Sequence, residues 1–319
     1  MIDKNLTRNI DLLKIEIYDF KINSNFIFYF MDTNTYTALV TPFKNNQIDE
    51  KAFSNLIEFQ IKNGIDGIVP CGTTGESPTL SHEEHNRLVE IAVKVANGKI
   101  KVMAGTGSNS TSEAVAMTNH AKKIGANSCL IVAPYYNKPT QEGIYQHFKE
   151  LNKCEIPLII YNIPGRSVIN ITDQTLARIS ELENVIGIKD ATGDLARIAT
   201  LRLLVKKDFL FLSGEDATAV GFNAMGGNGI ISVSSNILPK MISDLQKATA
   251  IGEYKTALRI QDQLTNFHSA MFCETNPIPV KYALSLMNFC ENEVRLPLVS
   301  PSLESQKRVK TEMENLNLI

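Results

Sequence analysis

The chain has 319 residues, a formal net charge of −2 at pH 7 and 44% hydrophobic residues. This apolar content is ample for a folded core and argues against intrinsic disorder. The balanced charge gives no general basic field, so we expect neither nucleic acid nor a membrane surface as a main partner. No apolar run approaches the roughly 18 residues of a transmembrane helix.

The first 31 residues differ in character from those that follow. Acidic and basic residues interrupt the apolar ones, and no long apolar centre or small-residue cleavage site indicates a secretory signal. Met31 then opens a segment that resembles a natural start. We therefore expect residues 1–31 to be a dispensable N-terminal extension, with a packed helix and strand as the alternative.

The cysteines indicate a reduced protein. They are odd in number, irregularly spaced and without a C-x-x-C pair. This pattern argues against a disulfide framework and against a zinc site. We expect a cytoplasmic protein with free thiols at Cys71, Cys129, Cys154, Cys273 and Cys290.

Short, nearly continuous apolar runs recur along the chain and are typical of parallel strands buried on both faces. They span residues 37–43, 67–72, 101–107, 129–136, 157–164, 185–192, 209–216 and 229–236. Segments with helical spacing lie between them, and Ser81 with Glu84 and Ser110 with Glu113 fit the capping box that begins a helix.

This alternation predicts an α/β fold, a (β/α)8 TIM barrel over residues 32–252. A doubly wound sheet is the alternative, but no G-x-G-x-x-G opens its first unit. Strand patterns stop after Asn236, so we predict helices over residues 237–252, 253–273, 276–289 and 302–319. Residues 253–319 would form a C-terminal helical region.

Catalytic residues of such a barrel are expected at the C-terminal ends of its strands. Lys189 stands there, in the run Val-Ile-Gly-Ile-Lys-Asp. Burial among apolar neighbours disfavours an ammonium group and lowers its pKa. A neutral amine can attack a ketone to form a Schiff base. The alternative is a structural pairing of Lys189 with Asp190 or Glu215.

Tyrosines at neighbouring strand ends favour the chemical interpretation of Lys189. Tyr161 ends the preceding run and could deliver the proton that Schiff-base formation requires, and Thr74 and Tyr136 could extend a chain of hydroxyls toward solvent. For any one tyrosine, packing at the barrel rim is the alternative.

Two features suit a substrate with carboxylates. The loop G-T-T-G-E-S at 72–77 offers backbone N–H groups and hydroxyls to a small anion, and it is too short for a Walker A loop. Arg166 offers a planar fork to a second carboxylate, with a surface ion pair as the alternative. His82 and His85 have no third metal ligand near them in sequence, so no metal site is expected.

The motifs together resemble the dihydrodipicolinate synthase family of pyruvate-dependent class I aldolases, over residues 37–301. They include TALVTPF (37–43), GTTGES (72–77), YNIPGR (161–166), GIKDATG (187–193) and NPIPVK (276–281). The resemblance implies a homotetramer that condenses pyruvate with L-aspartate 4-semialdehyde on the route to diaminopimelate and lysine, without metal or organic cofactor. Another pyruvate aldolase, such as N-acetylneuraminate lyase, and a catalytically silent barrel that binds amino acids stay as alternatives.

The resemblance also implies roles for single residues. Lys189 matches the Schiff-base lysine, Tyr161 the proton-transferring tyrosine, Thr74 the threonine that links two tyrosines, and Tyr136 the tyrosine that enters the neighbouring subunit's site. The residues matching substrate-binding positions are Thr73, Thr74, Arg166 and the backbone of Ile231. The residues matching the site through which L-lysine inhibits some members are Ser77, His82, His85, Asn109, Glu113 and Tyr135.

Overall fold

The computed structural model describes residues 33–206 and 208–319. The predicted N-terminal extension at 1–31 lies outside the described residues, so that interpretation stays a prediction. A small antiparallel hairpin of β2 (Phe43–Lys44) and β3 (Gln47–Ile48) precedes the first helix.

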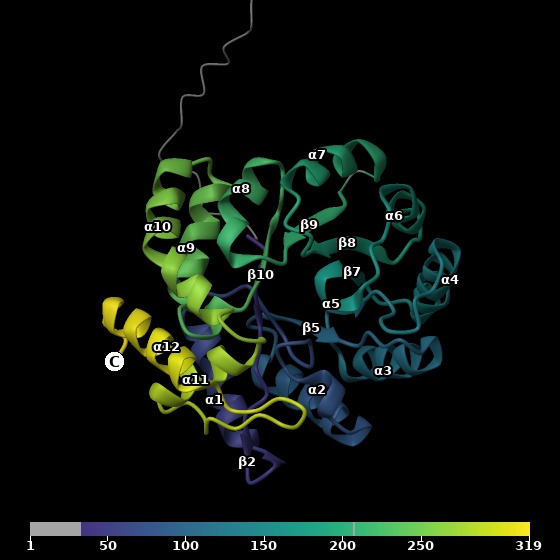
Figure 1. The fold of residues 1–319 in the computed structure, drawn as a ribbon. Coiled ribbons are helices and arrows are strands. Elements are labelled where there is room, and N and C mark those ends of the chain that lie inside the picture. The colour runs from purple at the N-terminus through teal and green to yellow at the C-terminus, as the bar shows by residue number, and fades with distance from the viewer. Residues whose placement is uncertain (1–32, 207) are drawn as a thin grey trace, which may run out of the picture. The chain divides into compact units, whose positions relative to one another are not determined.

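The described strands form a closed parallel barrel in the order β1-β10-β9-β8-β7-β6-β5-β4 (Figure 1). The ring closes because β1 pairs with both β10 and β4. The barrel strands are β1 (Thr35–Ala38), β4 (Gly67–Val69), β5 (Lys101–Gly105), β6 (Ser128–Val132), β7 (Leu158–Asn162), β8 (Val185–Asp190), β9 (Leu210–Ser213) and β10 (Gly229–Ser232). Every predicted run overlaps one of them, so the barrel prediction is confirmed and the doubly wound alternative is wrong.

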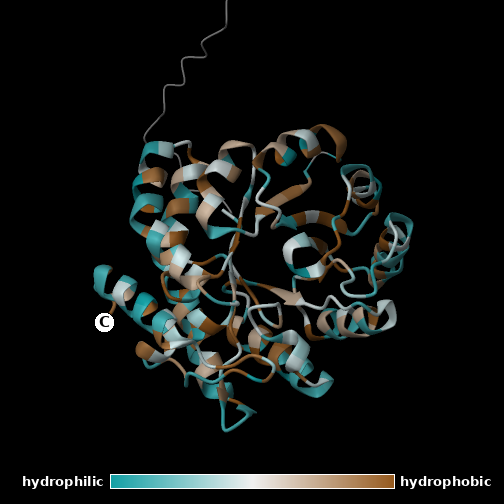
Figure 2. Ribbon diagram, in the orientation of Figure 1, coloured by the Kyte–Doolittle hydropathy of each residue, from teal (hydrophilic) through white to brown (hydrophobic). Residues whose placement is uncertain are grey.

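Helices follow the strands, and the longer of them cover the outside of the barrel (Figure 1). They are α1 (Glu50–Lys62), α2 (His82–Ala96), α3 (Thr111–Ile124), α4 (Gln141–Leu151), α5 (Pro164–Ser167), α6 (Asp173–Ser180), α7 (Leu195–Leu204), α8 (Ala219–Ala224) and α9 (Pro239–Ala250). Short 3-10 turns are η1 (Ser77–Thr79), η2 (Asn152–Cys154), η3 (Asp216–Thr218) and η4 (Ser234–Asn236). Most outer helices carry both hydrophilic and hydrophobic residues (Figure 2), as expected where one side packs and the other meets water.

The two predicted capping boxes have different outcomes. At the start of α2, the Glu84 N–H donates to Ser81 Oγ at 3.2 Å and the Ser81 N–H donates to Glu84 Oε2 at 2.9 Å. At the start of α3 the Ser110 side chain makes no cap hydrogen bond. That prediction is wrong because the Glu113 carboxylate accepts instead from the hydroxyl of Ser108.

The C-terminal region consists of α10 (Tyr254–Met271), α11 (Ile278–Leu286) and α12 (Leu303–Asn315), each within a predicted helical stretch. α10 packs along α9 and α12, and α11 packs on α12 (Figure 1). The division at residues 252 and 253 stays a prediction.

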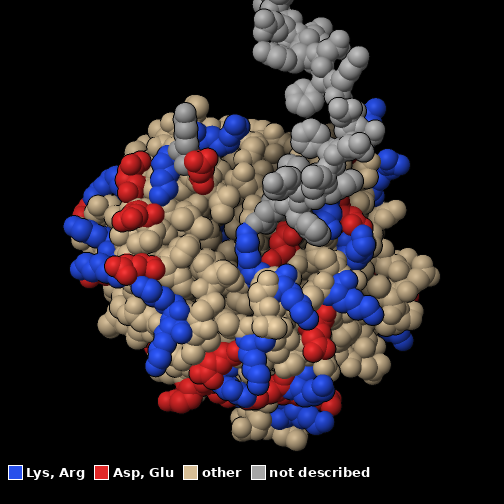
Figure 3. All heavy atoms as spheres, turned by 180° about the vertical axis from the view of Figure 1, so that it is seen from behind, with Lys and Arg blue, Asp and Glu red and all other residues tan. Residues whose placement is uncertain are grey.

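The surface and the cysteines agree with an ordinary globular chain. All five cysteines are free. Acidic and basic side chains are interspersed on the face shown in Figure 3. Over the part of the chain that the structure describes, no helix combines the length and apolarity needed to span a bilayer.

Two leucines of α10 test how firmly the C-terminal helices are packed. Leu264 is fully buried, whereas Leu258 is 49% exposed. We expect Leu264→Ala to lower the free energy of unfolding by about 2–5 kcal/mol, because it removes packed methyl groups and leaves a cavity. Leu258→Ala, the matched control on the same helix, should cost much less. Urea denaturation measures both, and equal losses would contradict this packing.

Candidate active site

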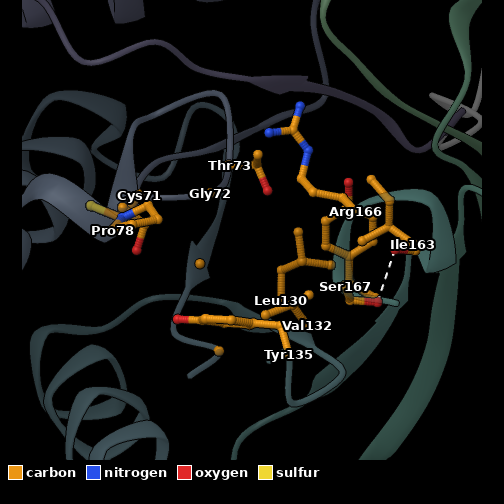
Figure 4. Close-up of a pocket in the computed structure, with 14 residues that line it drawn as sticks. Cys71, Gly72, Thr73, Pro78, Leu130, Val132, Tyr135, Ile163, Arg166 and Ser167 are labelled. Atoms are coloured by element: carbon orange, nitrogen blue, oxygen red, sulfur yellow. Dashed lines mark hydrogen bonds between the residues drawn. The ribbon is translucent and has the colours of Figure 1, made fainter. Parts of the chain in front are cut away.

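A cavity of about 260 Å³ opens at the C-terminal ends of the barrel strands (Figure 4). Its lining includes the predicted site residues Thr73, Tyr161 and Arg166, together with Ser77 and Tyr135. These residues come from loops and strand ends far apart in sequence. The barrel brings them together because its parallel strands all end at the same rim.

Lys189 lies beside this cavity, near the end of β8. Lys189 and Tyr161 are partners in the β7–β8 register, so their side chains share one face of the sheet. Lys189 is only 5% exposed. Its Nζ lies 4.3 Å from the centroid of the Tyr161 ring. The predicted pairing of the lysine with the tyrosine is therefore present in the fold.

The next residue along the strand shows which way Lys189 points. Asp190 accepts hydrogen bonds from Arg197 of α7 at 2.9 Å and from Thr192 at 2.5 Å. Successive strand residues face opposite sides, so Asp190 faces the outer helices and Lys189 faces the barrel interior. A structural role through pairing of Lys189 with Asp190 is thus disfavoured.

Burial is the main cause of the unusual pKa of Lys189. It lowers the pKa of Lys189 to about 8, while the negative charges of Glu215 and Asp216 oppose the shift and Arg166 adds to it. At a pKa of about 8, roughly one amine in ten is neutral at pH 7, against about one in 10³ for an ordinary lysine. Lys189 can therefore act as a nucleophile.

Tyr161 is suited to hold a proton next to that amine. Burial raises the pKa of its phenol; the charge of Arg166 lowers it in part, the charge of Glu215 raises it, and the Thr73 side chain has a smaller lowering effect. A protonated phenol at this position can donate to an oxygen that leaves the attacked carbonyl carbon.

The neighbouring threonine has a different partner. Thr74 is buried, and its Oγ1 accepts a hydrogen bond from Asn276 Nδ2 at 2.9 Å. The Thr74 hydroxyl is thus in contact with Asn276, whereas the Thr73 side chain is the threonine that acts on the pKa of Tyr161. The role of Thr74 as a link between two tyrosines stays a prediction. Tyr136, the outer member of that predicted chain, is 88% exposed and does not line the cavity.

The two other predicted substrate-binding residues lie at different depths. Arg166, on α5, extends over the cavity toward Thr73 (Figure 4). Its Nη2 donates to the backbone oxygen of Asn276 at 3.4 Å. Ile231 is fully buried in β10, paired with Tyr36 of β1, and does not itself line the cavity.

Asn276 was not identified from the sequence as a site residue. Its side chain bonds Thr74 and its backbone oxygen bonds Arg166, so it connects both predicted carboxylate-binding elements. The available signal was the motif NPIPVK, which Asn276 opens. The motif carried the family resemblance, but nothing in its local pattern indicated a contact with the site.

The residues predicted to bind L-lysine occupy a neighbouring area. His82 Nε2 lies 3.1 Å from Glu113 Oε1 at the surface, and Ser77 and Tyr135 line the main cavity. His85 is buried, and its Nε2 is 2.8 Å from the Gly105 carbonyl oxygen. The backbone oxygen of Asn109 accepts from the Asn137 amide at 2.8 Å.

The fold and site together define a class of protein. The (β/α)8 barrel buries a lysine of lowered pKa against a tyrosine. The cavity beside them has a guanidinium and a Gly-Thr loop in its lining. This arrangement suits imine chemistry on a carbonyl compound. This is the chemistry of a class I aldolase.

Comparisons with known proteins give the family. A sequence model described as the Dihydrodipicolinate synthetase family matches residues 31–316. A 4-hydroxy-tetrahydrodipicolinate synthase from Parvibaculum lavamentivorans is 53% identical over 290 residues, which cover 91% of this chain and 100% of that protein. The chain belongs to the dihydrodipicolinate synthetase family. The enzyme for which these relatives are named, 4-hydroxy-tetrahydrodipicolinate synthase, is a lyase.

Solved structures agree with this assignment. Dihydrodipicolinate synthase from Aquifex aeolicus matches with a TM-score of 0.88 and 44% identity, covering 89% of this chain and 98% of that one. A chloride-inhibited synthase from Acinetobacter baumannii, complexed with pyruvate, matches with a TM-score of 0.88 and 40% identity, covering 90% of this chain and 99% of that one. The synthase from Cyanidioschyzon merolae with lysine bound has a TM-score of 0.87 and 36% identity, and the match covers 89% of this chain and 98% of that one.

The lowered pKa of Lys189 predicts how its reactivity depends on pH. The neutral fraction of the amine should rise through a midpoint near pH 8. Glu215→Gln should move the midpoint to lower pH, because the carboxylate raises the pKa of Lys189. Competitive acetylation across pH 6–11, followed by mass analysis of the Lys189 peptide, measures this. A midpoint near 10.4, the ordinary lysine value, would contradict it. Glu304→Gln, at an exposed position on α12, is the control that should leave the midpoint unchanged.

Proposed function

We propose that this enzyme is a 4-hydroxy-tetrahydrodipicolinate synthase, which condenses pyruvate with L-aspartate 4-semialdehyde through a Schiff base on Lys189. The observation that carries the proposal is the buried Lys189 amine, with its lowered pKa, 4.3 Å from the Tyr161 ring. The reaction belongs to diaminopimelate and lysine biosynthesis, and we place it in the cytoplasm.

The first half of the reaction forms the nucleophile. Neutral Lys189 attacks the ketone carbon of pyruvate, and Tyr161 protonates the oxygen of the carbinolamine, which leaves as water. The resulting iminium ion is the electron sink for loss of a methyl proton, and an enamine forms. No metal or organic cofactor is required for these steps, because the protonated imine itself accepts the electrons.

The second half forms the new carbon–carbon bond. The enamine carbon attacks the aldehyde of the second substrate. The amine of that substrate then displaces Lys189 from the imine carbon and closes the ring, which releases the enzyme. Tyr161 and Thr73 carry protons in these steps through their hydroxyls, and Tyr161 lies close enough to the Lys189 amine to serve both halves.

Two elements hold the substrates in line. The loop with Thr73 and Thr74 binds the pyruvate carboxylate, beside the backbone of Ile231. Arg166 receives the carboxylate of the semialdehyde, to which its planar guanidinium can donate two parallel hydrogen bonds. Holding two reactants in alignment lowers the activation free energy by several kcal/mol.

Arg166 also bears on the choice among aldolases. A sugar acid such as N-acetylneuraminate would call for hydroxyl-binding partners at the position of this fork, whereas a semialdehyde with a carboxylate suits a guanidinium. Faster turnover of N-acetylneuraminate than of the semialdehyde condensation would favour the lyase. The buried Lys189 amine beside the Tyr161 phenol argues against the alternative of a catalytically silent barrel.

The proposal further includes a homotetramer. Tyr136 supports it, because a tyrosine that is 88% exposed on the isolated chain and has a left-handed φ of 70° would be an unusual surface residue unless a partner covers it. In the assembly we place this side chain in the neighbouring subunit's site, where it would extend the hydroxyl chain of Tyr161 and Thr73.

Borohydride trapping tests the central step. Reduction in the presence of pyruvate should add the mass of one reduced pyruvyl group to the peptide that contains Lys189. Lys189→Ala should give no adduct and lower condensation by several orders of magnitude. Lys189→Arg is the matched control that keeps a positive charge in the same place, and it should be equally inactive. An active Lys189→Arg variant would contradict the mechanism.

We also propose that L-lysine inhibits the enzyme through the area around Glu113. The surface position of His82 and Glu113 supports this, as does the related synthase with lysine bound. Millimolar L-lysine should lower the condensation rate, and Glu113→Gln should weaken the effect because it removes a negative partner for the ligand's ammonium. D-lysine serves as the control ligand. A rate unaffected by L-lysine would dispose of this proposal.

A further inference from the structure

A buried ion pair joins the C-terminal helices to the loop at 72–77. Lys281 Nζ, on α11, lies 2.6 Å from Glu76 Oε1, and both side chains are 0% exposed. The two residues are 205 positions apart in sequence. No step of the condensation uses either of them, so the pair needs an explanation of its own.

Stability alone is a poor explanation for this pair. Removing two charges from water is costly, and well-packed apolar residues in place of a buried ion pair are often as stable or more so. Burial accordingly lowers the pKa of Lys281, and the carboxylate of Glu76 opposes that shift. A pair of this kind is better explained where it fixes one particular arrangement of the chain.

The surroundings hold both members rigidly. The other oxygen of Glu76, Oε2, accepts from the backbone N–H of Arg295 at 3.0 Å. The guanidinium of Arg295 binds both carboxylate oxygens of Glu84 at 2.6 Å. The buried ring of Phe43 has Lys281 Nζ at 4.3 Å and the Arg295 guanidinium carbon at 4.2 Å from its centroid. Two acidic and two basic groups thus balance around one aromatic ring.

The loop itself is held in a demanding backbone conformation at this point. Glu76 is left-handed, with φ 56°, which is costly for a residue with a side chain. A Cβ at the preceding Gly75 would lie 3.0 Å from the backbone nitrogen of Cys71. Such a backbone conformation persists only where surrounding contacts hold it. The ion pair between Lys281 of α11 and the Glu76 carboxylate is one of these contacts.

A second contact attaches the same loop to the same region of the chain. Asn276, just before α11, donates from Nδ2 to Thr74 Oγ1 at 2.9 Å. The C-terminal segment therefore holds the loop at Thr74 and again at Glu76. Thr73, which lines the cavity, directly precedes the first of these anchors.

We propose that Glu76 and Lys281 are positioning residues that set the loop at 72–77 for the carboxylate of the keto acid, so that the C-terminal helices take part in substrate binding. This inference rests on the proposed function. Neither side chain touches the substrate; each acts through the backbone of the loop. Because donors must lie within about 0.5 Å of their productive geometry, a loosened loop should weaken binding of a carboxylate specifically.

The test compares two ketones that differ in their charge. Lys189 is trapped by borohydride with increasing pyruvate, and separately with methyl pyruvate, which has the same ketone but no carboxylate. In the double variant Glu76→Gln/Lys281→Met, which removes both charges at similar volume, the half-saturating concentration of pyruvate should rise about tenfold. That of methyl pyruvate should stay within about twofold, because its ester has no charge for the loop to bind.

Two further variants separate positioning from general loss of stability. Met313→Ala opens a cavity under α12, where Met313 is fully buried, and should lower the melting temperature without changing either half-saturating concentration. Lys281→Arg keeps the positive charge, so its half-saturating concentration of pyruvate should lie between those of the unmodified enzyme and the double variant. If the double variant does not fold, Glu76→Asp replaces it, since it keeps the charge and withdraws the carboxylate by one methylene.

The outcomes distinguish this inference from the proposed function. Absence of an adduct in the unmodified enzyme would refute the proposed function itself. An adduct in the unmodified enzyme with an unchanged pyruvate dependence in the variant would overturn the positioning role alone. Equal losses for pyruvate and methyl pyruvate would also overturn it, because the pair would then be purely structural.

Discussion

Desolvation of one amine is the interaction on which this site depends. Lys189 lies inside a barrel of apolar strands, and burial lowers its pKa to about 8 against the opposing charges of Glu215 and Asp216. The opposition matters as much as the burial. A lysine without those charges would lose its proton more readily, but it would then hold the iminium ion less well once formed. The site thus balances a neutral nucleophile against a charged intermediate.

The geometry that creates this balance comes from strand register. Parallel pairing of β7 with β8 sets Lys189 beside Tyr161, and the alternation of side chains turns Asp190 outward to Arg197. The carboxylate adjacent in sequence is thereby removed from the amine, while the proton donor is brought to it. A one-residue slip of β8 would exchange the two faces and place an aspartate where the lysine stands.

The other half of the site depends on contacts across the length of the chain. The loop at 72–77 follows the second barrel strand, β4, yet Asn276 and Lys281 hold it from the C-terminal region. Arg166 also bonds the backbone of Asn276. The helices beyond the barrel are therefore connected to both elements that we assign to substrate carboxylates, which gives this region a role in the site as well as in packing.

The sequence by itself determined the features that depend on local pattern. Apolar runs predicted every barrel strand, Ser81 with Glu84 predicted a helix start, and the position of Lys189 and Tyr161 at strand ends predicted that they meet. The tertiary structure decided which side chains bond one another: the Glu113 carboxylate accepts from Ser108, Thr74 accepts from Asn276, and Lys281 pairs with Glu76. Periodicity fixes the face on which a residue lies, because that follows from backbone geometry over a few residues. The partners of Thr74 and Glu76 depend on segments about 200 residues apart meeting at one point, and no local pattern encodes that meeting.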